Sequence, residues 1–367
     1  MDHLENLRDR WNDVLRRSRD NDVFSTWEWL SSWWKHFGKG RKLRILLAED
    51  KNKIVAIAPL MWSKYNFLHF VNLTKIEFLS SPESDYNSFI LTEKEIKCLE
   101  LFLNYLMDAH ADWDCLELRD INENAVLIDL LQKLSTRKSS GRQLEERLID
   151  LCPYIHLPDS IEMVMERLGG SMRRNLRRRM RKLEKEYRVE VKTQDSFGTI
   201  GEAMNAFYKL HQKRWQTKGM EGVFAEKTLR DFHFEVARIF AEKGWLSLYF
   251  LTANDEPIAS IYSFDYKQKT YEYLTGFDPE YSEYGVANLL RKCAIEECIR
   301  KGLKEYDLLR GNEPYKRDWN TKARKNFEVS YVKKGLFARI YGWATKSNTV
   351  LPFSQKLGSH VSLNRRQ

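Results

Sequence analysis

The stretch that decides the fold is residues 245–310, WLSLYFLTANDEPIASIYSFDYKQKTYEYLTGFDPEYSEYGVANLLRKCAIEECIRKGLKEYDLLR. Its runs of β-branched and aromatic residues predict strands, and the Asn, Asp and Pro residues between the runs predict turns. The expected order is strand, strand, strand, helix, strand, at Trp245–Thr252, Ile258–Tyr266, Thr270–Thr275, Gly285–Lys301 and Glu305–Leu309.

The first half of the chain repeats this order. It places strands at Leu43–Glu49, Ile54–Trp62 and Lys75–Leu79, a helix at Lys94–His110, and a strand at Asp114–Leu118. Strands that alternate with helices in this way predict an α/β class (α+β mixed sheets), here duplicated in tandem. The polar segment 132–148 marks the junction between the copies. We therefore expect an N-terminal domain over 1–150, a C-terminal domain over 151–345, and a tail over 346–367.

Between the copies the sequence predicts two further helices, over Ser171–Tyr187 and Ile200–Lys213. The first has an apolar stripe at helical spacing, and its remaining positions are almost solidly basic. Three interpretations stay open for this basic helix: a solvated surface, attraction of a polyanionic substrate or of cofactor phosphates, and contact with RNA.

Composition limits the class of protein. With 61 Lys and Arg against 52 Asp and Glu, the net charge is +9, which favours anionic partners. No apolar run is long enough for a membrane span, and the charged N-terminus does not resemble a signal peptide, so we expect a cytoplasmic protein. The five Cys and eight His show no metal-ligand spacing, so the sequence predicts reduced thiols and no metal site.

Several motifs give a specific resemblance. In order, they are Ala58-Pro59-Leu60, Ser84-Asp85-Tyr86, Met172-Arg173-Arg174-Asn175-Leu176-Arg177-Arg178, Leu210-His211-Gln212-Lys213-Arg214-Trp215, Pro257-Ile258-Ala259, Gly276-Phe277-Asp278-Pro279, and the segment from Asp307 to Trp319. From about residue 24 to 335 the chain resembles the CelD-like acetyltransferases, a family of the GNAT superfamily named for cellulose biosynthesis. Fem-type peptidyltransferases share the tandem arrangement.

The resemblance implies that acyl-CoA is a co-substrate and that no cofactor is tightly bound. In the superfamily the pyrophosphate of coenzyme A lies at a helix start, where backbone N–H groups and the helix dipole favour anions. The donor-binding residues implied here are Tyr273, Gly276, Gly285, Val286, Ala287 and Asn288. One departure from the family matters: the family has a Pro-Gly pair that opens this helix, and this chain has Tyr284-Gly285-Val286-Ala287 there, so only the glycine is kept.

Acyl transfer from a thioester needs a proton acceptor and preorganised donors for the oxyanion. No Ser-His-Asp or Cys-His pattern is visible, so we expect direct attack in a ternary complex. The candidate catalytic residues are Asp85, Arg310, Tyr315 and Lys316. The candidate substrate-binding residues are Tyr86, Arg173, Arg177, Arg214, Trp215, Glu313 and Trp319. Asp85 also has a structural interpretation as a turn residue, and Arg173 and Arg177 have one as part of a solvated helix face. An aromatic–cation packing cluster is the structural interpretation of Arg214, Trp215, Arg310, Tyr315, Lys316 and Trp319.

The family resemblance implies an amine or hydroxyl acceptor on a sugar, a peptide or another small molecule, including a glycan precursor in polysaccharide biosynthesis. Two alternatives stay open. One is a Fem-type peptidyltransferase that uses aminoacyl-tRNA, although no known nucleic-acid-binding motif is present. The other is a non-catalytic relative that binds RNA or another polyanion.

Overall fold

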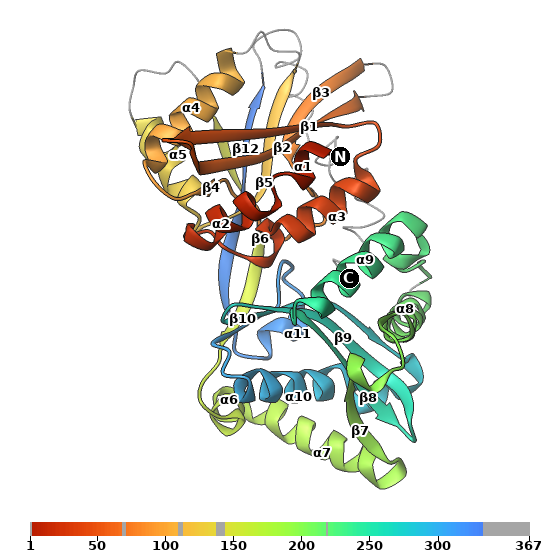
Figure 1. Ribbon diagram of the computed structural model, residues 1–367. Helices are drawn as coiled ribbons and strands as arrows, with labels where there is room; N and C mark the ends of the chain where they lie inside the picture. The colour runs from red at the N-terminus through yellow and green to blue at the C-terminus, as the bar shows by residue number, and fades with distance from the viewer. Residues whose placement is uncertain (1, 68–70, 109–112, 137–143, 218, 333–367) are drawn as a thin grey trace. The chain divides into compact units, whose positions relative to one another are not determined.

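The computed structural model describes residues 2–67, 71–108, 113–136, 144–217 and 219–332 (Figure 1). It divides into two compact units. Unit 1 contains residues 2–150 and takes up the chain again from Arg324, and unit 2 contains Leu151–Ala323. The sequence expectation of a continuous C-terminal domain to residue 345 differs from this division, because the last described strand belongs to unit 1. The expected tail over 346–367 lies outside the described residues.

Unit 1 has a sheet with the strand order β1-β2-β3-β5-β12, and the short β4 pairs with β2. Its strands are β1 Lys42–Asp50, β2 Lys53–Phe67, β3 Val71–Phe78, β4 Ile90–Leu91, β5 Cys115–Asn122 and β12 Lys322–Val332. Its helices are α1 Asp2–Glu5, α2 Arg8–Arg17, α3 Trp27–Phe37, α4 Glu95–Asp108 and α5 Val126–Thr136, with the 3₁₀ turn η1 Val23–Ser25. The neighbours β1 and β2, and β2 and β3, are antiparallel, whereas β3 and β5 are parallel.

Unit 2 has the strand order β6-β11-β10-β9-β8-β7. Its strands are β6 Glu145–His156, which enters from unit 1, β7 Val189–Thr193, β8 Leu246–Ala253, β9 Glu256–Tyr266, β10 Lys269–Phe277 and β11 Glu305–Asp307. Its helices are α6 Ile161–Arg167, α7 Gly170–Glu186, α8 Ile200–Gln216, α9 Lys227–Glu242, α10 Val286–Arg300 and α11 Pro314–Arg317, with the 3₁₀ turns η2 Gln194–Ser196, η3 Val223–Ala225 and η4 Pro279–Tyr284. Here too the meander β8-β9-β10 is antiparallel and the following pair, β10 with β11, is parallel.

The two units therefore repeat one topology, which confirms the expected tandem α/β fold. Each unit completes its sheet with a strand that follows the other unit's helices along the chain. β6 comes after α5 of unit 1 but pairs antiparallel with β11 of unit 2. β12 comes after α11 of unit 2 but pairs antiparallel with β5 of unit 1. The last strands of the two copies are thus exchanged.

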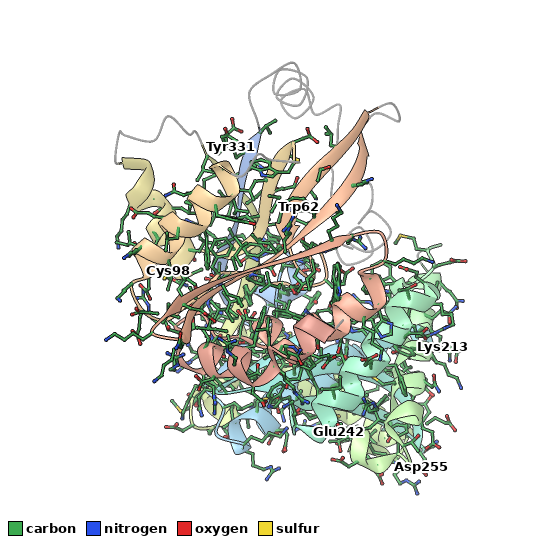
Figure 2. The ribbon with its side chains drawn as sticks, turned by 45° about the horizontal axis from the view of Figure 1, so that its top comes forward. Trp62, Cys98, Lys213, Glu242, Asp255 and Tyr331 are labelled. Atoms are coloured by element: carbon green, nitrogen blue, oxygen red, sulfur yellow. The ribbon has the colours of Figure 1, made fainter. Side chains whose placement is uncertain are left out.

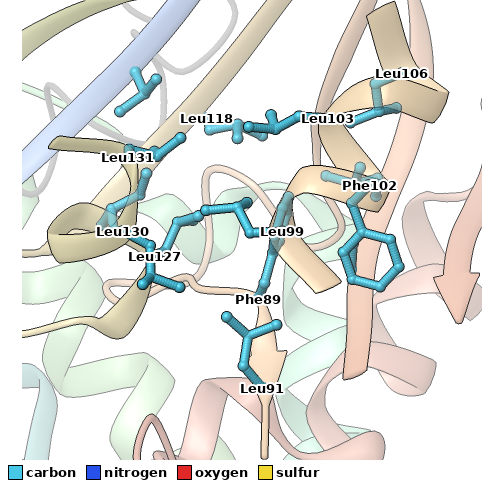
Figure 3. Close-up of a cluster of buried hydrophobic side chains, with 14 of the residues drawn as sticks. Phe89, Leu91, Leu99, Phe102, Leu103, Leu106, Leu118, Leu127, Leu130 and Leu131 are labelled. Carbon is cyan, nitrogen blue, oxygen red and sulfur yellow. The ribbon is translucent and has the colours of Figure 1, made fainter. Parts of the chain in front are cut away.

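Each unit has its own apolar core. In unit 1, side chains from α4 and α5 pack on β5 and around the β4 segment, and this cluster includes Phe89, Leu99, Phe102, Leu118 and Leu127 (Figure 3). In unit 2, α7 and α10 pack on one face of the sheet, and α8 and α9 pack on the other (Figure 1). The apolar stripe of the basic helix is buried on this core through Leu176 and Leu183.

Candidate functional site

The most distinctive site in unit 2 is the start of α10. Gly285 precedes the helix with φ +61°, a left-handed conformation that glycine adopts without steric penalty. Its carbonyl accepts the N–H groups of Asn288 and Leu289. Within the described residues, the N–H groups of Val286 and Ala287 have no acceptor. Two backbone donors at the positive end of the helix dipole are therefore available to an anion.

A pocket of about 210 Å³ opens at this helix start. Its lining comes from the end of α8, the end of β10, the turn before α10, the first turns of α10, and α11. The lining residues are Arg214, Thr275, Phe277, Ser282, Gly285, Val286, Ala287, Asn288, Arg291 and Tyr315.

Two arginines line the pocket, and the first is fully paired. The Arg291 guanidinium donates through Nε and Nη2 to the Glu272 carboxylate, at 2.8 Å and 2.6 Å. Glu272 also accepts from the hydroxyls of Tyr306 and Thr275. Burial opposes both charges, but their mutual attraction and these hydrogen bonds raise the pKa of Arg291 and lower the pKa of Glu272. This pair stays ionised and contributes no net charge to the pocket.

The second arginine, Arg214, has no acidic partner. Its Nη1 donates to the carbonyl oxygen of Thr275 at 2.9 Å, and its guanidinium carbon lies 5.5 Å from the ring centre of Phe277 and 5.7 Å from that of Trp215. Among the described residues, no carboxylate oxygen lies within 4.0 Å of it. Burial lowers its pKa and the nearby Arg291 acts in the same direction, whereas Tyr315 and the carboxylates of Glu313 and Glu272 act in the opposite direction. The pocket therefore holds one guanidinium that has no direct carboxylate partner among the described residues.

Tyr315 completes the polar lining. The guanidinium carbon of Arg291 lies 4.7 Å from the centre of its ring, a cation–π contact that fixes the ring. The phenol oxygen has no hydrogen-bond partner within the described chain. Burial raises the pKa of Tyr315, so the hydroxyl is protonated at neutral pH and can donate a hydrogen bond or a proton.

The other candidates near α11 lie outside the lining of the pocket. The ammonium of Lys316 is buried, donates to the carbonyls of Arg310 and Leu309, and lies 3.0 Å from Glu313. Trp319 is also buried, and its indole N–H donates to the side chain of Asn288. These contacts shape the loop between β11 and β12 and hold the first turn of α10.

Most of the candidates on β10 and α8 also lie outside the pocket lining. Tyr273 packs in the aromatic layer beneath α8 and α9, with its ring centre 5.1 Å from that of His233. A Cβ atom on Gly276 would lie 2.5 Å from the backbone nitrogen of His211, so this glycine is required where α8 crosses β10. Trp215 is buried, and its indole N–H donates to His211 at 3.0 Å. Of the expected residues on these elements, only Arg214 lines the pocket.

Two candidates lie in unit 1. Asp85 and Tyr86 are both buried there, in the segment between β3 and β4. The backbone carbonyl of Asp85 accepts from the side-chain amide of Asn326 on β12 at 2.8 Å. This hydrogen bond joins the turn to the strand that completes the unit 1 sheet.

The basic helix α7 contributes a residue that was not expected. Arg173 is half-buried and Arg177 is exposed, and neither lines the pocket. Arg179 instead extends over the start of α10: a Cβ atom on Gly285 would collide with its Nη1. Its Nε is buried without a hydrogen-bond partner within the described chain.

Sequence reasoning also missed Glu272, Ser282 and Arg291. A signal was present for two of them. Arg291 interrupts the apolar face formed by Leu289, Leu290, Ala294 and Ile295, and Glu272 stands between two aromatic residues of a strand. A charged residue on the buried face of a helix or strand predicts a buried partner of opposite charge, and Glu272 and Arg291 form such an ion pair.

Within the described residues, no group of three or more His, Cys, Asp or Glu side chains is arranged to hold a metal ion. No helix in the described part of the chain is long and apolar enough to cross a bilayer.

Comparison with known proteins defines the class. Residues 170–317 match the model of the acetyltransferase (GNAT) domain. This segment contains α7 to α11 and every residue of the pocket. The chain therefore carries a GNAT-type acetyltransferase domain and is an acyltransferase.

Solved structures agree on the fold. FemX matches with a TM-score of 0.64 at 12% sequence identity, over 89% of this chain and 96% of that one. L-PGS from Bacillus licheniformis matches with a TM-score of 0.53 at 10% identity, over 86% of this chain and 94% of that one. No curated protein matches the chain in sequence. At these identities, the structural matches concern the fold alone.

Proposed function

We propose that unit 2 binds an acyl-CoA thioester in the α10 pocket and transfers the acyl group, most simply acetyl, to an amine or hydroxyl. The observation that carries this proposal is the pair of unpartnered N–H groups at Val286 and Ala287, in a segment that matches a GNAT acetyltransferase domain. GNAT domains generally use acyl-CoA as co-substrate. The residues present suit its phosphates, because Arg179 adds positive charge beside the same helix start.

The proposed reaction is a direct displacement. The acceptor nitrogen or oxygen attacks the thioester carbonyl carbon and loses a proton, the C–S bond breaks, and the thiolate that leaves takes up a proton. Tyr315 supplies that proton, since its hydroxyl is protonated and unpartnered in the pocket, and the proton that the acceptor releases reprotonates the Tyr315 phenolate. Arg291 holds the Tyr315 ring in position. Asp85, Arg310 and Lys316, which the sequence suggested as catalytic residues, are weaker candidates for that role than Tyr315, because they do not line the pocket.

The acceptor and the location are proposed from the resemblance of the sequence to CelD-like acetyltransferases. On that basis the acceptor is an amine or hydroxyl of a sugar or glycan precursor, and the enzyme acts in the cytoplasm.

A second candidate is transfer from aminoacyl-tRNA, the Fem-type alternative. The observation that favours it is the basic surface of α7, where Arg174, Arg177, Arg178 and Arg181 are exposed. Binding through such a surface depends on phosphate contacts and weakens steeply as salt rises.

Thermal denaturation with acetyl-CoA, longer acyl-CoAs and tRNA tests both candidates. A ligand that binds only the folded protein stabilises it by about 2.7 kcal/mol at a concentration 100 times its Kd. We expect acetyl-CoA to raise the melting temperature in this way. Stabilisation by tRNA alone, lost at high salt, would favour the second candidate instead.

A matched pair of glycine variants locates the site. Gly285→Asn places a side chain in the space of Arg179, and Gly244→Asn makes the same change at φ +68° with no neighbour within 4 Å. Asn tolerates the left-handed conformation better than most residues. We expect Gly285→Asn to weaken acetyl-CoA binding by about tenfold or more, equal to about 1.4 kcal/mol, and Gly244→Asn to leave it unchanged. Equal affinity in the two variants would place the donor elsewhere.

A further inference from the structure

The proposed binding of the donor phosphates does not use the guanidinium of Arg214. The phosphates of the donor are assigned to the start of α10 and to Arg179. Arg214 instead enters the pocket from the C-terminal end of α8, and its one hydrogen bond, to the Thr275 carbonyl, leaves other N–H groups of the guanidinium unused.

The position of Arg214 relative to the proposed chemistry follows from a chain of contacts. Arg214 donates to the Thr275 carbonyl, and the Thr275 hydroxyl donates to Glu272 at 3.0 Å. Glu272 pairs with Arg291, whose guanidinium lies against the Tyr315 ring. Tyr315 and Arg214 both line the pocket. The unpaired guanidinium therefore lies in the same pocket as the proposed proton donor.

Arg214 is half-buried, and removing a cation from water without an ion-pair partner is unfavourable, so the site is suited to a ligand that brings the opposite charge. The planar fork of a guanidinium matches a carboxylate through paired N–H···O bonds, and the aromatic rings of Phe277 and Trp215 fix its plane. Glu272 and Glu313 act on Arg214 only from beyond ion-pair distance, so a ligand carboxylate can supply the direct partner that the described residues do not.

We propose that Arg214 binds the carboxylate of a substrate, so that the enzyme acts on a carboxylate-bearing molecule. The proposal rests on the proposed function and specifies its substrate class. The carboxylate has two sources: the far end of a dicarboxylic acyl chain on the donor, or a carboxyl group on the acceptor.

The first experiment needs no coenzyme A. The full-length protein is titrated calorimetrically with succinate and with its neutral analogue succinamide. We expect succinate to bind, succinamide not to bind, and Arg214→Met to weaken succinate binding by about 10- to 100-fold, the range for hydrogen bonds between charged groups. Lys209→Met is the matched control, since it removes one positive charge from the exposed side of the same helix.

The variant Arg214→Lys tests whether weaker succinate binding by Arg214→Met results from a folding defect. It keeps the charge but loses the planar fork, so we expect a folded protein, by its melting temperature, that binds succinate several-fold more weakly. Wild-type succinate affinity in both folded Arg214 variants, or no succinate binding to the wild-type protein, overturns the proposal.

The second experiment separates the two sources. If the carboxylate belongs to the acyl chain, the wild-type protein binds succinyl-CoA about tenfold or more tightly than acetyl-CoA, and Arg214→Met removes the difference. If it belongs to the acceptor, both thioesters bind alike, and with acetyl-CoA the release of free thiol is faster with amino acids than with their amides, again only when Arg214 is present.

The failures are distinguishable. Equal weakening of CoA, acetyl-CoA and succinyl-CoA by Arg214→Met would make Arg214 a phosphate ligand and overturn the carboxylate assignment. Failure of CoA and acetyl-CoA to bind the wild-type protein would overturn the proposed function, while the succinate titration still reports on Arg214.

Discussion

The buried Glu272–Arg291 pair allows a quantitative prediction for unit 2. The Glu272 and Arg291 side chains are 4% and 2% exposed, so neither charge can be solvated if its partner is removed. We consider Glu272→Gln, which removes the negative charge but keeps an oxygen that can accept from the hydroxyls of Tyr306 and Thr275.

Breaking one side of a buried ion pair costs about 3–5 kcal/mol, because the remaining charge stays buried and uncompensated. For a unit of this size, each kcal/mol lowers the melting temperature by about 2–4 °C, so the expected loss is roughly 6–20 °C. The double variant Glu272→Gln, Arg291→Met removes both charges and should lose clearly less than the sum of the single variants.

The measurement is a double-mutant cycle by urea denaturation, followed by tryptophan fluorescence and circular dichroism. The control is Glu242→Gln, which breaks an exposed i,i+4 pair with Arg238 on α9 and should change the unfolding free energy by less than about 0.5 kcal/mol (Figure 2). A loss below about 1 kcal/mol for Glu272→Gln, or strict additivity in the double variant, would refute the reasoning.

Four further predictions follow from the site. Tyr315→Phe should lower kcat by on the order of 10- to 1000-fold and leave the melting temperature nearly unchanged; wild-type turnover would exclude Tyr315 as the proton donor. Lys316→Met should destabilise the protein by about 1–3 kcal/mol, because the carbonyls of Leu309 and Arg310 lose a buried donor, and an unchanged melting temperature with lost turnover would return this lysine to a catalytic role. Because the pKa of Glu272 lies below its ordinary value of 4.5 in the folded protein, its stabilising contribution is present above that pH and is lost as the pH falls toward the lowered value; acid titration should therefore destabilise the wild-type protein more steeply than Glu272→Gln, and parallel curves would contradict this. Finally, activity should survive treatment with a chelator, and loss of activity that is restored by Zn²⁺ or Mg²⁺ would show a metal requirement.

The sequence by itself determined most of the elements. The predicted strands of the second half, and the two helices predicted before them, agree with the elements of unit 2 within a few residues. These segments have strong local signals, because their apolar residues recur at strand or helix periods and their ends carry Gly, Pro, Asn or Asp. The helix α9 and the strands β7 and β12 were not foreseen, although they are equally regular.

Only the tertiary structure decided which strands pair. β6 begins in the polar segment 132–148 that the sequence assigned to a domain junction and runs on to His156, and β12 lies in the segment assigned to the C-terminal domain. β6 and β12 pair with strands far away in the chain, through hydrogen bonds that local composition does not record.

For the functional site, too, the sequence determined some features and the tertiary structure decided others. The local pattern predicted a helix that begins at Gly285, and the family resemblance implied the roles of Gly285, Arg214 and Tyr315 in the site. The tertiary structure decided that Arg291 is neutralised by Glu272 and that Arg214 is not. The sequence does not show whether a carboxylate lies beside an arginine in the folded protein. The burial of the guanidinium and its distance from the nearest carboxylate decide whether it can bind an anionic ligand.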